Sequence, residues 1–235
     1  MKLSIIIPIF NEQKTVEELI TKVLEVSLPR GVKKEIVVVN DGSTDSTLKI
    51  LQKIKGNIKI INHEKNQGKG AAIRTGIKHS SGDLFIIQDA DLEYNPSDYK
   101  KLLIPILTNN AQVVYGTRLV NYPLKIWGKD KTVMPVHLIA NKFLTGFTNL
   151  VYRSHLTDME TCYKLLTRNL LEKLSLKSEK FDFEPEVTAK ILRLNIPIVE
   201  VPITVKPRTY KEGKKIGYKD GIAAIWTLIK YRFIN

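Results

Sequence analysis

The 235-residue sequence contains a single cysteine and no long apolar run, and both absences limit what the chain can be. Cys162 has no partner for an internal disulfide, which favours a reducing compartment. No stretch reaches the roughly 18 apolar residues that a membrane-spanning helix needs, and the N-terminus lacks the length and the cleavage site of a signal peptide. We therefore expect a cytoplasmic protein, which can contact a membrane only peripherally, on its cytoplasmic face.

Glycine-rich motifs that bind nucleotide phosphates are also missing. A nicotinamide-dependent dehydrogenase needs Gly-x-Gly-x-x-Gly directly after its first strand, where residues 8–12 of this chain read Pro-Ile-Phe-Asn-Glu. The Gly-Lys-Gly at 68–70 comes later and has no third glycine at the right offset. The chain also lacks the phosphate-binding run of P-loop NTPases and the glycine-rich basic loop that sugar nucleotidyltransferases usually carry after the first strand. These absences argue against all three enzyme classes.

Negative charge is in short supply. The 37 lysines and arginines outnumber the 24 aspartates and glutamates, which gives a net charge of +13 and an isoelectric point of about 9.6. Such an excess favours polyanionic partners, among them nucleic acids, anionic lipid headgroups and phosphorylated substrates. No nucleic-acid-binding motif is recognised, so we expect no nucleic-acid partner. A basic binding module without catalytic activity is the alternative from another class, and its binding would weaken steeply with salt without needing a divalent metal.

The first half of the chain alternates short apolar runs with segments of helical periodicity. Strands that are each followed by a helix imply a mostly parallel central sheet flanked by helices, and hence a Rossmann-like α/β fold. Ligands of such sheets bind outside the carboxyl ends of the strands. We expect strands at 3–9, 35–39, 59–62, 84–88 and 111–116, and helices at 15–26, 45–54, 70–79 and 96–107.

The second half is less regular, and we expect it to complete a single domain that spans residues 1–235. The pattern weakens from 120 to 153, where we expect irregular connections and helices. The remaining expected elements are helices at 165–174 and 186–194, an edge or bulged strand at 198–205 that contains Pro202, a basic loop at 206–219 and an amphipathic helix at 220–233.

The strongest local signal is a cluster of carboxylates, Asp89, Asp91 and Glu93, which follows the apolar run at 84–88. At spacings of two residues in an extended chain, their side chains share one side. Clustered carboxylates repel one another unless a cation neutralises them. Hard oxygen ligands suit Mg²⁺ or Mn²⁺, which also hold phosphate oxygens. The cluster therefore indicates a metal site, with a solvated acidic turn as the alternative.

Two further polar turns follow predicted strands. Glu12 lies in the turn after the first strand, and Asp41 lies in the turn after the second. Each turn has a structural explanation, because its polar residues can cap the next helix, and Asp41 could instead accept a hydrogen bond from a base edge. In a parallel sheet all three turns lie at one edge, so five acidic residues would converge in a chain of net charge +13. Such a costly convergence favours a metal-dependent site.

Five short motifs occur in order along the chain. They are Ile-Ile-Ile-Pro at 5–8 with Asn-Glu at 11–12, Val-Val-Val-Asn-Asp-Gly-Ser-Thr-Asp at 37–45, Asn-Gln-Gly-Lys-Gly at 66–70, Asp-Ala-Asp at 89–91 and Gly-Thr-Arg at 116–118. Together they resemble the family-two glycosyltransferases of the GT-A fold, and the likeness is closest to dolichyl-phosphate mannose synthases and polyprenyl-phosphate glucosyltransferases. The likeness is close over residues 1–120 and looser from Thr157 to the end.

The resemblance implies an inverting transferase that moves a hexose, mannose or glucose, from GDP-mannose or UDP-glucose to a polyprenyl or dolichyl phosphate. A polysaccharide or glycolipid acceptor is the alternative. Residues 1–120 would form the nucleotide-sugar-binding half, 121–219 the acceptor half and 220–233 a C-terminal amphipathic helix. The resemblance places the donor on Pro8, Phe10, Glu12, Val39, Asp41, Asp89, Ala90, Arg118, Arg208 and Lys214.

The Asp-x-Asp motif of that family further implies a reaction that depends on Mg²⁺ or Mn²⁺. Asp91 would be the principal metal ligand and act in catalysis, assisted by Asp89. Glu93 is a third candidate ligand, although relatives often carry glutamine at its position. Arg208 and Lys214 resemble a basic loop that closes over phosphates, and a solvated basic loop is the alternative for both.

Asp158 is the candidate catalytic base, because an inverting transfer needs a group that takes the acceptor proton or orients the nucleophile. A phosphate acceptor is already ionised near neutral pH and has less need of a base. A structural carboxylate that caps the following helix is the alternative for Asp158. Glu184 and Glu186 are expected primarily to stabilise a helix N-terminus through the helix dipole, and secondarily to contact the acceptor.

The predicted C-terminal helix carries an apolar stripe flanked by basic residues, a pattern that suits a membrane interface. We expect the stripe to dock onto the protein's own core, with membrane contact as the alternative; both hold where one edge of the helix stays exposed. The stripe consists of Ile222, Ile225, Trp226, Ile229 and Phe233.

Overall fold

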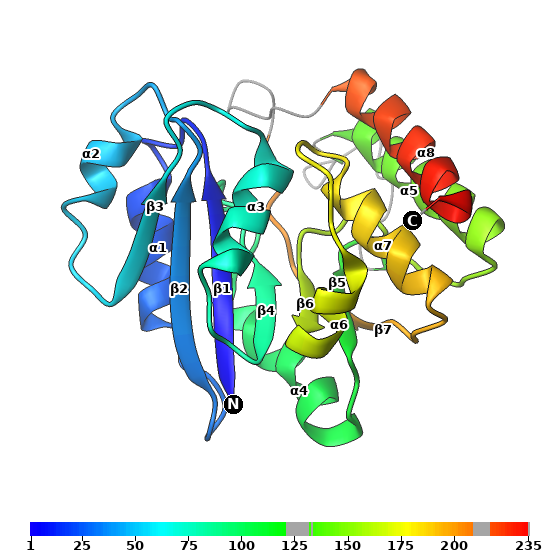
Figure 1. The fold of residues 1–235 in the computed structure, drawn as a ribbon, viewed down its shortest axis with the longest axis horizontal. Coiled ribbons are helices and arrows are strands. Elements are labelled where there is room, and N and C mark those ends of the chain that lie inside the picture. The colour runs from blue at the N-terminus through cyan, green and yellow to red at the C-terminus, as the bar shows by residue number, and fades with distance from the viewer. Residues whose placement is uncertain (121–131, 133, 209–216, 235) are drawn as a thin grey trace.

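The computed structural model describes residues 1–120, 132, 134–208 and 217–234. Within these ranges a seven-stranded sheet lies at the centre and helices cover both of its faces (Figure 1). The expected α/β class is therefore confirmed. Lys214 and most of the predicted basic loop lie outside the described residues.

The central sheet has the strand order β3-β2-β1-β4-β6-β5-β7. All neighbouring pairs are parallel except the two made by β6, which runs antiparallel to both β4 and β5. The strands are β1 (Lys2–Ile9), β2 (Lys33–Asn40), β3 (Ile58–Asn62), β4 (Leu84–Ile87), β5 (Val113–Thr117), β6 (Lys164–Thr167) and β7 (Val199–Pro202). The strand with Pro202 lies at the sheet edge, as its proline predicts.

Helices α1 and α3 cover opposite faces of the sheet (Figure 1). This follows from right-handed crossovers, because the chain moves one way from β1 to β3 and then back past β1 to β4. The helices are α1 (Val16–Glu25), α2 (Thr47–Leu51), α3 (Lys69–Lys78), the 3₁₀ turn η1 (Pro96–Asp98), α4 (Tyr99–Asn109), α5 (Pro135–Tyr152), α6 (Arg168–Leu174), α7 (Phe183–Arg193) and α8 (Tyr218–Phe233).

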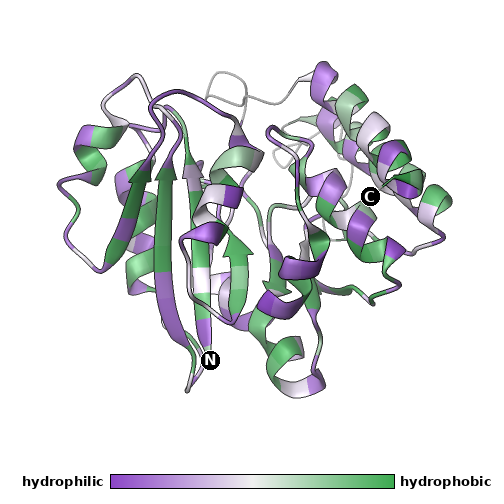
Figure 2. Ribbon diagram, viewed as in Figure 1, coloured by the Kyte–Doolittle hydropathy of each residue, from purple (hydrophilic) through white to green (hydrophobic). Residues whose placement is uncertain are grey.

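The main core lies between the sheet and these helices. Ile5, Ile6 and Ile7 of β1 are fully buried, so this strand is apolar on both faces instead of alternating, as expected for a central parallel strand. Figure 2 shows the same concentration of apolar residues along the central strands. Gly76 of α3 packs so closely on β1 that an added Cβ would lie 2.4 Å from Ile6. The helix and the strand therefore require glycine at this contact.

One predicted element is wrong in part. The expected helix at 165–174 begins only at Arg168, and Lys164–Thr167 form strand β6 between β4 and β5. The run Lys-Leu-Leu-Thr is too short for periodicity to distinguish a buried strand from a helix. The weakly patterned region also contains an 18-residue helix, α5, that sequence periodicity did not define.

The prediction that the C-terminal stripe docks onto the core is wrong for most of the stripe, since only Ile225 packs against a buried cluster. Helix α8 packs against α5 and α7 through Ala224, Thr227, Leu228 and Tyr231, on a different face. The stripe residues Ile222, Trp226 and Phe233 are instead 65%, 66% and 80% exposed. None of the described helices combines the length and the apolar character that crossing a membrane would require.

Candidate active site

A cavity of about 830 Å³ opens at the sheet edge where the parallel strands end. Strand β6 enters the sheet from this edge, so the residues before it, rather than those after it, face the cavity. The predicted site residues that line the cavity are Pro8, Phe10, Glu12, Asp41, Asp89, Ala90, Asp91, Glu93, Arg118 and Arg208. Of the other predicted residues, Val39 is buried in β2 and Asp158 is buried beside the cavity; neither is among the described residues that line it.

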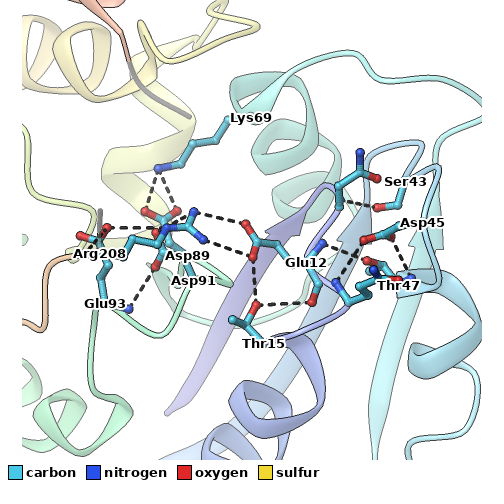
Figure 3. Close-up of polar contacts among 12 residues, drawn as sticks. Glu12, Thr15, Ser43, Asp45, Thr47, Lys69, Asp89, Asp91, Glu93 and Arg208 are labelled. Atoms are coloured by element: carbon cyan, nitrogen blue, oxygen red, sulfur yellow. Dashed lines mark hydrogen bonds and ion pairs between the residues drawn. The ribbon is translucent and has the colours of Figure 1, made fainter. Parts of the chain in front are cut away.

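Arg208 lies at the centre of the acidic cluster (Figure 3). Its guanidinium is 3.3 Å from Glu12 Oε1, 3.4 Å from Asp91 Oδ2 and 3.7 Å from Glu93 Oε1. Burial, with the negative charges of Asp89 and Glu93, nevertheless raises the pKa of Asp91 to about 7. The cluster therefore holds more negative charge than Arg208 balances.

An excess of carboxylate oxygens fits a hard divalent cation such as Mg²⁺ or Mn²⁺. Asp91 and Glu93 would hold such an ion at the place where Arg208 now contacts them. Across the described residues, no three histidine, cysteine or acidic side chains are gathered round a common point as they stand. The metal set of Asp89, Asp91 and Glu93 stays a prediction.

Asp89 differs from Asp91 because a lysine already pairs with it. Lys69 Nζ lies 2.8 Å from Asp89 Oδ1 and 2.7 Å from Glu184 Oε1. Lys69 is the first residue of α3 and follows Gly68, whose φ of +98° favours glycine. An added Cβ on Gly68 would lie 2.3 Å from the carbonyl oxygen of Glu179, so the glycine lets the start of α3 pack against the chain before α7. The motif at 66–70 signalled this turn, but not that Lys69 would neutralise Asp89.

Asp41 holds the loop that leads into α3. Its Oδ1 accepts a hydrogen bond from the Gln67 amide at 2.9 Å and its Oδ2 accepts one from the Gly68 amide at 2.8 Å. His63 Nδ1 lies 2.7 Å from Asp41 Oδ1, and its Nε2 lies 3.0 Å from Thr75 Oγ1. Contact of Asp41 with a nucleobase stays a prediction, and its observed role is to order this wall of the cavity. His63 was not foreseen, because its partners are far away in the sequence.

The turns after β1 and β2 are hydrogen-bonded to each other, as Figure 3 shows in part. The Glu12 amide donates to Thr47 Oγ1 at 2.9 Å, and Thr15 Oγ1 donates to Glu12 Oε2 at 2.9 Å. Asp45 accepts from the amides of Gln13 and Thr47. A structural role in the turn therefore accounts for Asp45. Glu12 takes part in the same hydrogen-bond network and also contacts Arg208.

Asp158 is committed to Arg118. Its Oδ2 accepts from Arg118 Nε at 2.7 Å and from the Arg118 amide at 2.9 Å, and its Oδ1 accepts from Arg118 Nη2 at 2.7 Å. The Asp158 side chain is fully buried, while Arg118 lines the cavity. The two-pronged contact fixes the guanidinium plane of Arg118. The role of Asp158 as a base stays a prediction, and what the geometry shows is that it positions Arg118.

Because Arg208 occupies the carboxylates that a cation would use, Arg208→Gln is expected to bind Mn²⁺ more tightly than the unaltered protein in the absence of nucleotide. We expect an affinity gain of about tenfold, or about 1.4 kcal/mol. This is roughly a third of the 4 kcal/mol or so that two unit charges at this distance have at an effective dielectric of 20. Free Mn²⁺ measured by electron paramagnetic resonance during a titration reads this out. Lys22→Gln, which removes one exposed positive charge on α1, is the matched control. Equal Mn²⁺ affinity in the two variants would show that Arg208 does not compete for the site.

Two curated relatives are similar over most of the chain. A dolichol-phosphate mannosyltransferase of Pyrococcus furiosus is 30% identical over 221 residues, which cover 92% of this chain and 60% of the relative. A UDP-N-acetylglucosamine–dolichyl-phosphate N-acetylglucosaminyltransferase of Methanococcus voltae is 27% identical over 248 residues, which cover 96% of this chain and 94% of the relative. The chain thus spans less than two thirds of the first relative.

Among solved structures, glucosyl-3-phosphoglycerate synthase of Mycobacterium tuberculosis in complex with Mn²⁺, uridine diphosphate and phosphoglyceric acid superposes with a TM-score of 0.73. The superposition covers all of this chain and 79% of that one at 20% identity, which shows a shared fold. The family model described as "Glycosyl transferase family 2" matches residues 4–175, a span that begins within β1, runs past β6 and contains the cluster at Asp89–Glu93. The chain therefore belongs to glycosyl transferase family 2.

Proposed function

We propose that this protein transfers a hexose from a nucleotide-diphosphate sugar to a polyprenyl phosphate, with inversion at the anomeric carbon and with the help of a divalent cation. One observation carries the proposal: a single cavity joins the carboxylate cluster at the sheet edge to the apolar faces of α5 and α8. The relatives named for transfer to dolichol phosphate or dolichyl phosphate support the acceptor class.

The donor would bind along the end of the cavity formed by the first half of the chain. Asp41 and Asn66 line the part beside β2 and suit the nucleoside, and Phe10 offers a ring for the base. Asp91 and Glu93 would hold Mg²⁺ or Mn²⁺, which when bound would neutralise charge on the leaving diphosphate. Released from the carboxylates, Arg208 can bind phosphate oxygens.

A phosphate acceptor agrees with the state of Asp158. A phosphate oxygen is already ionised near neutral pH, so it can attack the anomeric carbon without a base. Asp158 is fully buried and bound to Arg118, which suits a residue that positions a phosphate-binding group. Arg118 lines the cavity and can orient the acceptor or the donor phosphate.

The apolar side chains of α5 and α8 would admit the lipid part of the acceptor. The two helices lie side by side (Figure 1), and each contributes exposed apolar residues to the mouth of the cavity: Val136 and Phe143 from α5, and Ile222 from α8. Trp226 and Phe233 extend this surface along α8. Exposed basic residues flank it, at Lys142, Lys219, Lys230 and Arg232. Apolar and basic side chains together suit an anionic membrane surface, at which the acceptor would be presented.

A transfer assay on lipid vesicles tests the proposal. Vesicles with anionic lipid and polyprenyl phosphate are mixed with UDP-glucose or GDP-mannose and Mn²⁺, and sugar-linked lipid is measured. Trp226→Ser is expected to lower this transfer about tenfold, the cost of losing one large apolar contact with the membrane, and to spare transfer to a water-soluble, short-chain phosphate. Ile104→Ser, which alters an exposed apolar residue on α4, is the control.

The acceptor assignment fails on one clear result. The result would be transfer to a hydroxyl acceptor, such as a glycolipid or an oligosaccharide, without transfer to any polyprenyl phosphate. It would indicate that the protein acts in glycan or glycolipid synthesis. If Trp226→Ser lowered transfer equally to the vesicle-bound and to the short-chain acceptor, membrane contact through this residue would be contradicted.

A further inference from the structure

Glu160 is a carboxyl group of the cavity that the contacts described above do not use. Glu184 is paired with Lys69, and Asp158 is paired with Arg118. Glu160 also lines the cavity, yet its Oε1 is enclosed and has no hydrogen-bond partner among the residues that the structure describes. An enclosed oxygen without a partner costs the folded protein free energy, which makes a ligand the natural candidate to satisfy it.

The backbone holds Glu160 firmly in this place. On one side the Met159 amide donates to Thr145 Oγ1 of α5 at 3.1 Å. On the other side Thr161 Oγ1 donates to the Gly116 carbonyl, and the Cys162 amide donates to the hydroxyl of Tyr94 at 3.0 Å. The segment before β6 therefore presents the Glu160 side chain from a fixed support.

A structural role would require a charge that Glu160 balances. Lys164 is one candidate, but its Nζ donates to the carbonyls of Met159 and Thr161 and lies 4.6 Å from the ring centre of Tyr115. Burial and then the charge of Glu184 raise the pKa of Glu160 to about 7, against the opposing effect of Lys164 and Arg118. Its surroundings therefore disfavour the charge rather than use it.

We propose that Glu160 accepts hydrogen bonds from hydroxyl groups of the transferred sugar and helps to determine which sugar the enzyme uses. The proposal rests on the function proposed above. An ionised carboxylate would repel a phosphate, whereas a sugar is a neutral group whose hydroxyl donors a carboxyl oxygen can accept in either protonation state. In a transfer reaction the sugar lies between the donor diphosphate and the acceptor. Glu160 lines the same cavity and lies within electrostatic reach of Arg118 and of Glu184, which pairs with Lys69.

The test compares a nucleotide with its own nucleotide sugar. Dissociation constants of UDP and UDP-glucose, and of GDP and GDP-mannose, are measured by calorimetry with Mn²⁺ for the unaltered protein and for Glu160→Gln. We expect Glu160→Gln to bind the nucleoside diphosphate normally and to bind the nucleotide sugar about 10- to 100-fold more weakly, because the amide nitrogen that replaces one carboxyl oxygen cannot accept a hydrogen bond from a sugar hydroxyl. We also expect a smaller preference in kcat/KM for the best sugar over its epimer. Glu172→Gln, on the exposed side of α6, is the matched control.

The outcomes separate this inference from the proposed function. An equal effect of Glu160→Gln on nucleotide and nucleotide sugar, or no effect on either, overturns the sugar contact alone. Normal binding of the nucleotide sugar with a loss confined to transfer, and with a changed pH profile, assigns Glu160 to the acceptor and also overturns it. Failure of the unaltered protein to bind any of these nucleotides overturns the proposed function and this inference with it. Glutamine has the shape of glutamate, and urea denaturation confirms that the variant is folded.

Discussion

Asp91→Asn is expected to lower sugar transfer roughly a thousandfold, because a divalent cation contributes several kcal/mol to a transition state of this kind and Asp91 would be its principal ligand. Among the residues that the structure describes, no lysine pairs with Asp91, and its pKa of about 7 reflects how strongly the site disfavours its charge in the absence of a second cation. Calorimetry with UDP and GDP, with and without Mn²⁺, should show that metal-dependent nucleotide binding is lost together with transfer.

Stability provides the control for Asp91→Asn. The pKa of Asp91 is raised on folding, so ionisation of this group costs the folded protein free energy as the pH rises from its ordinary pKa towards about 7. Asparagine carries no charge, so the variant should be at least as stable as the unaltered protein at pH 8 in urea denaturation, with the difference vanishing in acid. An inactive variant that is also unfolded would leave the loss unexplained by the metal, and a fully active variant would exclude Asp91 as a ligand.

Asp158→Ala is expected to destabilise the protein by about 3–5 kcal/mol, since removal of one partner leaves a buried charge uncompensated. Asp158 is fully buried, and it makes hydrogen bonds to both the amide and the guanidinium of Arg118. Alanine would leave the guanidinium, 15% exposed, without its carboxylate. Urea denaturation followed by circular dichroism measures the change.

A double variant separates the charge from the lost volume. Arg118→Met removes the uncompensated cation, so combining it with Asp158→Ala should restore part of the lost stability. Glu172→Ala breaks an exposed pair with Arg168 and should change stability by well under about 1 kcal/mol. The Asp158→Ala protein could instead be stable and folded but transfer sugar slowly, with an altered pH profile. That result would indicate that Asp158 acts as a base.

The first half of the fold could be predicted because its signals are local. Each strand from β1 to β5 is an apolar run bounded by polar turns, and each helix between them has its own periodicity. The convergence of Glu12, Asp41 and the cluster at Asp89–Glu93 followed from one rule, that parallel strands end at the same edge. Those residues do line one cavity.

What could not be predicted depends on contacts between distant parts of the chain. Lys69 and Glu184 are separated by 115 positions, and no local pattern relates them. Strand β6 was missed because four residues carry too little periodicity, and the orientation of α8 was missed because an apolar stripe does not reveal which neighbour it meets. Glu186 did prove structural: it accepts from the Lys177 and Ser178 amides and pairs with Lys190.

The antiparallel direction of β6 bears on how this protein could evolve. Turns that leave a parallel strand can change length without disturbing the sheet, because the next element is a helix that can shift. The segment 157–163 has no such freedom: it is pinned to α5 and to the end of β5 before it enters β6 between two strands. One inserted residue would either shift the register of β6 or turn Glu160 away from the cavity. New substrate preferences should therefore arise here by substitution rather than by insertion or deletion.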